Sequence, residues 1–316
     1  MKISVAIAAY RGEKYIGDQL VSIVNQTVVP DEVVICDDSP DDLTENEVRK
    51  FEKFLNIRYF RNSVQLGAAA NFNKALSLCT GDVVFLADQD DVWYPYKVAW
   101  MMERFSAGAQ AVFCDSDITD ANGEKMGFTH FESRGYAGLR KYAPGVWKSQ
   151  FSDSCRRFPA AGHDMALKND LLKKLLPIPE LANCHDNYLG VAAAAFDAWE
   201  IVPDSCGTFR RHGNNSSGAG TKLSFLGQLK TARASVKNNS FAWNAELFRS
   251  IIEKLPDLPR ERIALLKERM EHSLARVQMG EKKSKKLRLI IQEIRNRNYF
   301  RFGRGWKNVI QDLFLR

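Results

Sequence analysis

Three carboxylates follow one apolar stretch and form the chemically most suggestive feature of the chain. Asp88, Asp90 and Asp91 come directly after residues 83–86, whose unbroken apolar run predicts a buried strand. Like charges this close repel one another, and each resists the loss of water. Mg²⁺ sites commonly use one or two carboxylates together with substrate phosphates, so the cluster predicts a cation site. A solvated turn with Asp91 as a helix cap is the simpler alternative, but it explains one carboxylate better than three.

A second acidic point lies at the end of another expected strand, 32–36, where Asp37 and Asp38 follow the apolar residues 33–36. Alternating strand and helix patterns predict an α/β fold with a parallel sheet. Ligands bind such sheets beyond the carboxyl ends of the strands, so the two acidic points should meet in one crevice. We expect strands at 3–8, 32–36, 57–60, 83–86, 111–115 and 199–202, and helices at 13–26, 43–55, 67–79, 164–176 and 188–196.

The composition is that of an ordinary globular protein. The 316 residues are 45% hydrophobic and 26% charged, enough for one large domain with an appendage or for two domains. No apolar run reaches the roughly 18 residues that a membrane-spanning helix needs, and the run at 3–9 is too short for a signal-peptide core. The six cysteines form no Cys-x-x-Cys pair, which argues against a zinc knuckle or redox motif. We therefore expect a cytoplasmic protein.

The second half of the chain changes character. Residues 118–158 contain many glycines and little periodicity, which predicts a long irregular connection. The Gly-, Asn- and Ser-rich residues 213–220 indicate a boundary. We expect a first domain at 1–218 and a helical region at 219–316, with helices at 222–254, 259–281, 283–297 and 304–315.

The C-terminal tail carries the basic charge of the chain. Residues 281–316 contain 11 Lys and Arg against three acids, a net charge of +8, whereas the whole chain has +7. Apolar residues recur at helical spacing in this tail, which fits a helix lying on an anionic membrane surface, here the inner face of the cell membrane. The alternatives are packing of the tail on the first domain and, last, nucleic acid, which we do not expect as a partner. The recurring residues are Leu287, Ile290, Ile291 and Ile294.

Eight motifs in a fixed order extend over about the first 218 residues. Together they resemble the inverting nucleotide-sugar glycosyltransferases of the GT-A fold, a family that includes bacterial rhamnosyltransferases and other O-antigen and capsule enzymes. The resemblance implies a Rossmann-like, mostly parallel sheet flanked by helices and followed by a C-terminal helical extension. The motifs are 5–15 (Val-Ala-Ile-Ala-Ala-Tyr-Arg-Gly-Glu-Lys-Tyr), 22–27, 34–39, 67–71, 86–93 (Leu-Ala-Asp-Gln-Asp-Asp-Val-Trp), 161–166, 185–189 (His-Asp-Asn-Tyr-Leu) and 209–215.

The resemblance assigns roles around the donor nucleotide. Asp38 would accept a hydrogen bond from the base, whereas Asp37 would serve the turn that ends its strand. Asp90 would bind Mg²⁺ or Mn²⁺, which allows carboxylates and a diphosphate to share one site. His212 would complete the metal shell, although a surface histidine is nearly as good an interpretation. The remaining donor-side residues implied are Ala8, Ala9, Tyr10, Glu13, Asn71 and Asp88, the last reaching the ribose or the metal shell.

The acceptor side is implied in the same way. Inversion needs one general base, and the resemblance gives this role to Asp186, for which an ordinary helix cap is the alternative. Arg210, Arg211, His163 and Trp93 are expected to contact phosphate or acceptor, and His163 could equally be a satisfied structural histidine.

These observations predict a metal-dependent inverting glycosyltransferase. It would move a sugar from a nucleotide donor, dTDP-rhamnose or a UDP-hexose, to a hydroxyl of a surface polysaccharide or a polyprenyl-linked glycan. A nucleotidyltransferase is the alternative among enzymes, but the loop after the first strand has only one glycine, Gly12. A non-catalytic nucleotide-sugar or glycan-binding module is the alternative outside them.

Overall fold

The computed structural model divides the chain into two compact units, which are described separately. Among described residues, the first unit contains 1–134, 161–178 and 185–213, and the second contains the helices from residue 240 onward. The expected domain boundary at 218 lies outside the described residues and stays a prediction. The structure describes residues 1–134, 161–179, 185–213, 240–281, 283–303 and 305–314.

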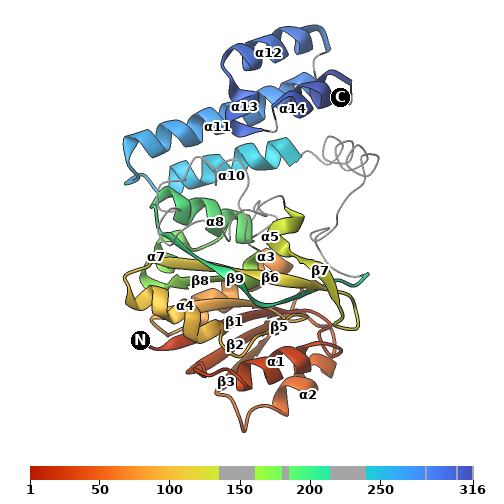
Figure 1. Cartoon of the computed structure of the whole chain (residues 1–316), viewed down its shortest axis with the longest axis vertical. Helices are drawn as coiled ribbons and strands as arrows, with labels where there is room; N and C mark the ends of the chain where they lie inside the picture. The colour runs from red at the N-terminus through yellow and green to blue at the C-terminus, as the bar shows by residue number, and fades with distance from the viewer. Residues whose placement is uncertain (135–160, 180–184, 214–239, 282, 304, 315–316) are drawn as a thin grey trace. The chain divides into compact units, whose positions relative to one another are not determined.

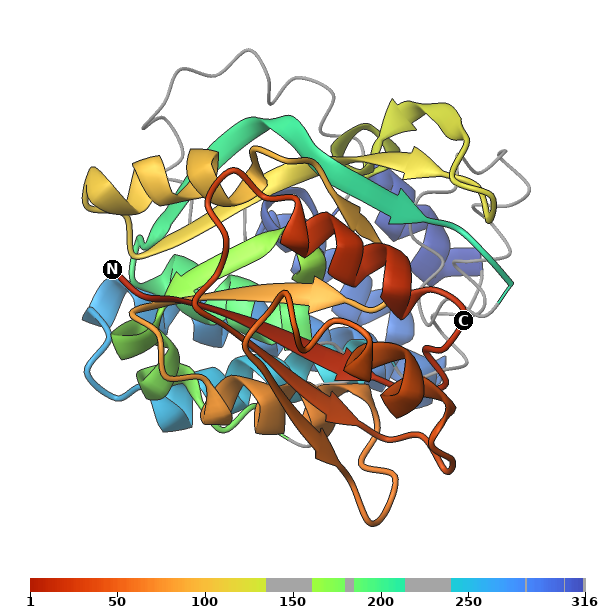
Figure 2. The same cartoon turned by 90° about the horizontal axis from the view of Figure 1, so that it is seen from below.

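The first unit is built on one mixed sheet of nine strands in the order β3-β2-β1-β4-β8-β6-β9-β5, with β7 paired to β6 (Figure 1). The strands β1 to β4 are parallel and lie side by side, as Figure 2 also shows. β8 is antiparallel to both β4 and β6, whereas β6 and β9 are parallel. The strands are β1 (Ile3–Ala9), β2 (Glu32–Asp37), β3 (Ile57–Arg61), β4 (Val83–Asp88), β5 (Val92–Trp93), β6 (Ala111–Thr119), β7 (Lys125–Thr129), β8 (Met165–Lys168) and β9 (Trp199–Arg210).

Helices cover both faces of this sheet. α1, α2 and α4 contribute Ile16, Val48 and Met101 to a core cluster that also contains Val5 and Ile7 of β1. α3 packs on β1 and β2 and also contacts α8, which in turn contacts α7. The helices of this unit are α1 (Ile16–Val24), α2 (Leu43–Arg49), α3 (Ala68–Leu78), α4 (Lys97–Ser106), α5 (His130–Ser133), α7 (Asn169–Leu175), α8 (His185–Ala195) and the short 3₁₀ turn η3 (Gly162–Asp164).

Burial on both faces explains why the central strands are continuous apolar runs. All six residues of β2 are buried, and so are the first five of β4. Strands of a parallel sheet covered by helices on both sides read in this way, in contrast to the alternating pattern of half-exposed strands. The α/β fold expected from the sequence, a sheet flanked by helices, is therefore confirmed, and a C-terminal set of helices follows it.

The register of the strands brings the two acidic strand ends together. Ala8 of β1 lies opposite Cys36 of β2 on one side and opposite Asp88 of β4 on the other. Ala9, the next residue, pairs with Asp37. The carboxyl ends of these three strands thus share one edge of the sheet, as the sequence predicts, and this edge positions the candidate site.

Two sequence-based assignments of elements were wrong. Residues 164–176 do not form a single helix, because 165–168 form β8, which pairs with β4 and β6 before α7 begins. Residues 118–133 are not irregular either: β6 continues to Thr119, β7 returns beside it, and α5 begins with a capping box between Thr129 and Glu132. The rest of the expected irregular connection, 135–158, lies outside the described residues.

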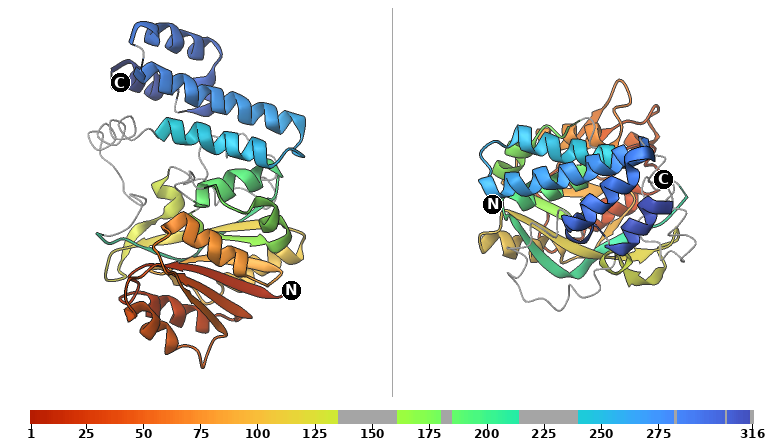
Figure 3. Two further views of the ribbon diagram at one scale, coloured as in Figure 1. Left: turned by 180° about the vertical axis from the view of Figure 1, so that it is seen from behind. Right: turned by 90° about the horizontal axis from the view of Figure 1, so that it is seen from above.

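The second unit is helical. α10 and α11 lie side by side (Figure 3), and α12, α13 and α14 follow. A small core of Met279, Ile290, Tyr299 and Val309 joins α11 to the last three helices. No described helix is both long and apolar enough to cross a membrane. The helices are α10 (Ser240–Lys254), α11 (Arg260–Glu281), α12 (Lys283–Arg295), α13 (Asn298–Phe302) and α14 (Trp306–Phe314).

Candidate active site

The acidic loop after β4 is fastened to the end of β1 by Gln89. Its side-chain oxygen accepts from the backbone N–H of Tyr10 and its side-chain nitrogen donates to the Tyr10 carbonyl, each at 2.9 Å. A Cβ atom on Gly12 would lie 2.3 Å from the Gln89 Oε1, so only glycine leaves room for this amide. Gln89 thereby fixes the loop that also contains its two sequence neighbours, Asp88 and Asp90.

Asp90 and His212 lie side by side although 122 residues separate them in the sequence. Nε2 of His212 lies 2.7 Å from Oδ2 of Asp90, and their side chains are 10% and 19% exposed. The imidazole stacks on the ring of Tyr15 at 4.8 Å between centroids and 16° between planes. The two side chains predicted to bind the metal are therefore adjacent at a partly open position.

A second cluster of ionisable side chains surrounds the buried His163. Its Nδ1 lies 3.3 Å from Asp91 and 3.6 Å from Asp88, and its Nε2 lies 3.1 Å from Asp164. Burial disfavours the imidazolium, but Asp164 and Asp91 outweigh burial and raise the pKa of His163 well above its usual value. Although burial opposes ionisation of Asp164, His163 and Lys97 hold the pKa of its carboxyl at about 2. Both ring nitrogens thus face carboxyl groups, which favours the protonated form of the imidazole.

Sequence analysis missed the partners that complete this cluster. Lys97 is 1% exposed, and its Nζ donates to the His163 carbonyl at 2.7 Å and lies 3.8 Å from Asp164. Ser116 lies 3.1 Å from both His163 and Asp164. Each residue belongs to a different element that reads as ordinary, so only the fold brings them together. The one available signal is that Lys97 falls on the apolar side of its helix, next to Val98 and Met101.

Asp91 and Trp93 differ from their expected roles. Asp91 caps no helix, because α4 begins at Lys97. Instead Asp91 is 1% exposed and accepts from the backbone N–H of Arg210 at 2.9 Å. Trp93, expected to contact phosphate or acceptor, is 2% exposed and packs in the core with Phe85. An indole buried in this way supports the site from below and contacts no substrate.

Two sets of side chains could bind a divalent cation. Asp88, Asp91 and His163 offer ligand atoms within 4.8 Å of one another and form one candidate cation site. At Asp90, burial and then the neighbouring charge of Asp88 raise the pKa of the carboxyl, which marks a place where positive charge is needed. Carboxylate oxygen suits Mg²⁺ and Mn²⁺, and imidazole is a common additional ligand. The residues present therefore fit a cation at Asp90 and His212, with Asp88 next to them.

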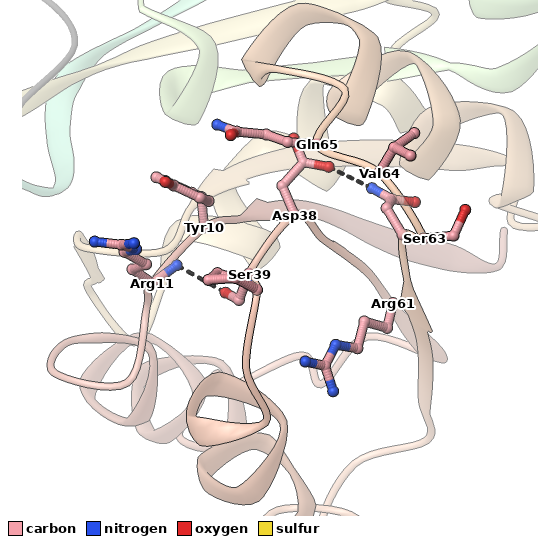
Figure 4. A pocket seen from close by; sticks show the side chains of 10 residues that line it. Tyr10, Arg11, Asp38, Ser39, Arg61, Ser63, Val64 and Gln65 are labelled. Atoms are coloured by element: carbon pink, nitrogen blue, oxygen red, sulfur yellow. Dashed lines mark hydrogen bonds between the residues drawn. The ribbon is translucent and has the colours of Figure 1, made fainter.

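A pocket of about 710 Å³ opens beside the ends of β1 and β2 (Figure 4). Asp38 lies on its inner wall, and its carboxylate accepts from Asn62 at 2.7 Å, from the backbone of Leu66 at 3.1 Å and from that of Gly67 at 2.8 Å. A carboxylate has about four lone-pair directions, so one acceptor site is left for a ligand. Exposed Arg61 lies across the pocket. The other lining residues are Tyr10, Arg11, Ser39, Pro40, Ser63, Val64 and Gln65.

Asn71 and Asp37 shape this edge from within. The Asn71 amide donates to the carbonyls of Ala9 and Cys36 at 3.1 and 2.9 Å, so it ties the ends of β1 and β2 together. Asn71 is buried and lines no part of the pocket, so it acts on a ligand only through the backbone that it positions. Asp37 accepts from the backbone N–H and hydroxyl of Ser39 at 2.9 and 2.6 Å, which confirms its turn role.

Three further predicted residues, Glu13, Arg210 and Arg211, do not line this pocket. Glu13 is exposed near Thr44, at the 3.5 Å limit of a hydrogen bond. The Arg210 guanidinium lies 2.8 Å from Asp18 and 5.0 Å over the Tyr15 ring. Arg211 donates its backbone N–H to Thr119 at 2.9 Å. His163, by contrast, is 1% exposed, which corrects its expected contact with acceptor or phosphate.

Asp186 lies in the first turn of α8 and is half-buried. Its Oδ1 accepts from the backbone N–H of Asn187 at 2.6 Å. The positive end of a helix dipole favours an ionised carboxylate at this position. Asp186 thus lies at the start of α8, within the same unit as Asp90.

Comparison with known proteins identifies the family. Residues 4–161, half of the chain, match the model of glycosyl transferase family 2. The protein belongs to this family. It is 30% identical over 96 residues to the Escherichia coli UDP-Glc:alpha-D-GlcNAc-diphosphoundecaprenol beta-1,3-glucosyltransferase WfgD, and 32% over 123 residues to the abequosyltransferase RfbV of Salmonella typhimurium. These matches cover 30% and 38% of this chain and only 38% and 37% of those relatives.

Solved structures support the fold. Residues 1–349 of TarS from S. aureus match with a TM-score of 0.59 at 17% identity, covering 89% of this chain and 80% of that one. The mannosyltransferase PcManGT from Pyrobaculum calidifontis, in complex with GDP-Man and Mn²⁺, matches with a TM-score of 0.52 at 17% identity over 99% of this chain and 84% of that one. At this identity the likeness shows the GT-A fold alone.

Proposed function

We propose that this member of family 2 is a metal-dependent inverting glycosyltransferase that transfers a hexose from a nucleotide donor to a hydroxyl of a lipid-linked glycan. The observation that carries the proposal is the placement of Asp90 and His212, 2.7 Å apart, on the same edge of the sheet as the pocket of Asp38. A base pocket and a cation position on one edge correspond to the two ends of a nucleoside diphosphate.

The donor nucleotide is proposed to lie with its base at Asp38. The remaining acceptor site of this carboxylate suits an N–H of a pyrimidine, and Tyr10, with Ala8 and Ala9 before it, is proposed to contact the donor through its backbone. Arg61 across the pocket supplies positive charge toward a negatively charged ligand. Asn71 would support this site by holding the Ala9 carbonyl.

The diphosphate is proposed to reach Asp90 and His212. A divalent cation bound there supplies Lewis-acid stabilisation of the charge that develops on the leaving diphosphate. The complex of PcManGT with GDP-Man and Mn²⁺ supports this assignment by analogy. Gln89 keeps Asp90 in position, and the buried His163 lies between Asp91 and Asp164, at 3.3 and 3.1 Å.

Asp186 is proposed as the base that takes the proton from the acceptor hydroxyl. The oxygen of the acceptor would attack the anomeric carbon as the bond to the diphosphate breaks, and the proton would pass to a carboxylate oxygen of Asp186. A single displacement inverts the anomeric configuration, so one base is sufficient.

The names of the relatives guide the choice of substrates. WfgD is named for UDP-Glc and a diphosphoundecaprenol-linked acceptor, and one solved form of TarS is a complex with UDP-GlcNAc. We therefore place a UDP-hexose before dTDP-rhamnose as donor, and an undecaprenol-linked glycan as acceptor.

The test is nucleotide release from a panel of sugar nucleotides, with and without EDTA. We expect one donor to be turned over, activity to disappear with EDTA and to return with Mn²⁺ or Mg²⁺, and Asp90→Asn to lower kcat/KM by about a hundredfold or more. Asp257→Asn, a change at an exposed carboxylate of the second unit, is the matched control and should have no effect. Release of pyrophosphate would indicate a nucleotidyltransferase, and donor binding without turnover would indicate a binding module. Full activity of Asp90→Asn in EDTA would overturn the proposal.

A further inference from the structure

The last helix of the second unit has its apolar face directed outward. Trp306, Ile310, Leu313 and Phe314 are 61%, 54%, 37% and 76% exposed. They recur at the i, i+4, i+7 and i+8 positions of one helical face. The opposite side of α14 faces inward with Val309 and Asp312, which are 3% and 0% exposed. α14 thus buries a carboxylate and exposes its large apolar side chains, the reverse of an ordinary surface helix.

A buried ion pair holds α14 in this orientation. Asp312 accepts from Nε and NH2 of Arg276 at 2.8 and 2.9 Å, and its Oδ2 also accepts from the Tyr299 hydroxyl at 2.8 Å. Arg276 is itself 5% exposed. Rotating α14 to bury its apolar face would leave a buried guanidinium without its carboxylate, which is strongly unfavourable. The outward apolar face is therefore built into the packing of this unit.

The apolar surface continues onto neighbouring helices. The ring of Phe300 in α13 meets that of Trp306 edge to face at 5.5 Å. Nζ of Lys286 in α12 donates to the Leu313 carbonyl at 2.9 Å, which joins α12 to the end of α14. We call Phe300, Trp306, Ile310, Leu313 and Phe314 the α14 face.

Within α12 to α14 the exposed charges have one sign, and one of them, Arg301, pairs at 2.6 Å with the exposed Glu268 of α11. The only acids of residues 283–314, Glu293 and Asp312, are both buried and paired, Glu293 with His272 and Asn298. The basic side chains of the same helices lie at the surface. Among the described residues, α12 to α14 therefore offer water an apolar and cationic surface without an exposed carboxylate. The exposed basic residues are Lys285, Arg288, Arg295, Arg297, Arg301 and Lys307.

This combination selects one kind of partner. Aromatic and long aliphatic side chains next to Lys and Arg are the composition of helices that lie in the headgroup region of anionic bilayers. A nucleic acid would use the cations but would leave Ile310, Leu313 and Phe314 against water or phosphate. A second copy of the chain would bring the same excess of positive charge against itself. We propose that the α14 face docks on an anionic lipid surface.

The proposal goes beyond the transferase activity and does not depend on it. Two contributions would favour docking. The α14 face would partition into the headgroup region, and the basic side chains would be attracted to anionic lipid. Each Lys or Arg near such a surface contributes about a fivefold gain in partitioning at low salt. Binding should therefore require both anionic lipid and the apolar face.

Co-sedimentation of the full chain with sucrose-loaded vesicles tests the proposal without any sugar donor. We expect binding to phosphatidylcholine vesicles that contain phosphatidylglycerol, and binding at least about tenfold weaker to phosphatidylcholine alone or in high salt. Ile310→Glu should lower binding by about tenfold or more, since it places a carboxylate in the headgroup contact. Val29→Glu, at an exposed apolar residue of the first unit, is the matched control and should bind like the wild type.

Thermal melting of Ile310→Glu identifies any loss of vesicle binding that comes from misfolding. Phe314→Glu is a second variant, at the most exposed residue of the α14 face. Equal binding of wild type, Ile310→Glu and Phe314→Glu to anionic vesicles would overturn the proposal, and so would absence of wild-type binding. A stable dimer that Ile310→Glu dissociates would assign the face to a second copy instead. Displacement of the protein from vesicles by an RNA duplex, seen only when the α14 face is intact, would likewise reject the lipid assignment.

Discussion

His185 packs directly over the backbone of Gly162, so that a Cβ atom on Gly162 would lie 2.3 Å from its Nε2. The other side of the imidazole stacks on Phe72 at 3.9 Å between ring centroids. The ring is therefore held between α3 and the 3₁₀ turn, and Asp186 follows it in the chain. This packing holds the backbone at the beginning of α8 and thereby positions the proposed base, Asp186.

Gly162→Ala should displace His185 and, with it, Asp186. We expect kcat to fall by about tenfold, because small misplacements of a reacting group are costly, while the Kd for the donor changes little. The control is a double-mutant cycle with His185→Ala. Once the ring is gone, the added methyl has nothing to displace, so the two effects should be far from additive. Additive effects would show that Gly162 acts by another route.

Asp186→Asn should remove transfer while donor binding survives. An amide of the same shape cannot take the acceptor proton, so we expect kcat to fall by about a thousandfold. Isothermal titration with the nucleotide donor and Mn²⁺ measures the binding side, and the steady-state rate measures the chemical side. Equal loss of donor affinity and of kcat would remove the assignment of Asp186 as base.

Gln89→Ala should weaken metal dependence rather than abolish activity. The substitution removes two hydrogen bonds to Tyr10, each worth about 1 kcal/mol, and frees the loop that contains Asp90. We expect the Mn²⁺ concentration for half-maximal activity to rise by about tenfold. Gln89→Glu should act in the same direction, since a carboxylate cannot donate to the Tyr10 carbonyl. Gln292→Ala, an exposed glutamine of α12, is the control. An unchanged metal requirement in Gln89→Ala would contradict the role of this clamp.

Most residues at the carboxyl edge of the sheet can be predicted from the sequence, but few of the buried residues that support this edge can. Continuous apolar runs identify β1, β2 and β4, and the rule for carboxyl ends of parallel strands then places Asp38 and Asp88 on one edge without any long-range information. His212 was placed near Asp90 only through the family resemblance, because 122 residues separate them. Periodicity has no means of reporting such a contact.

The buried cluster was beyond sequence reasoning for a physical reason. His163, Asp164 and Lys97 each have an ordinary local explanation, and only the pairing of β8 with β4 and β6 brings them together. The same pairing explains the wrong helix at 164–176, since residues 165–168 contain good helix formers that tertiary contacts hold in a strand. The orientation of α14 is similar. Its amphipathic pattern is evident in the sequence, but Arg276 decides which face is buried.

Glu32→Gln should lower stability at neutral pH and leave the active site intact. Glu32 opens β2, at the end of the strand opposite to Asp37, and accepts from Ser4, from the Thr80 backbone and from Arg58 at 2.6, 2.6 and 2.8 Å. Burial opposes ionisation, but these hydrogen bonds outweigh it and lower the pKa of Glu32 from 4.5 to about 2. A shift of this size corresponds to about 3 kcal/mol of stability from the ionised carboxylate.

The sign of the shift fixes the pH window. The folded-state pKa lies below the unfolded value, so this contribution is complete above pH 4.5 and is lost as the pH falls through the folded-state value of about 2. Urea unfolding of wild type and Glu32→Gln should therefore differ most near neutral pH, and the difference should shrink steadily in acid. The kcat of the folded variant at low temperature should match that of the wild type, because Glu32 lies away from the carboxyl edge. A difference in unfolding free energy that stays constant down to the acid limit would mean that shape, and not the charge of Glu32, stabilises this end of the sheet.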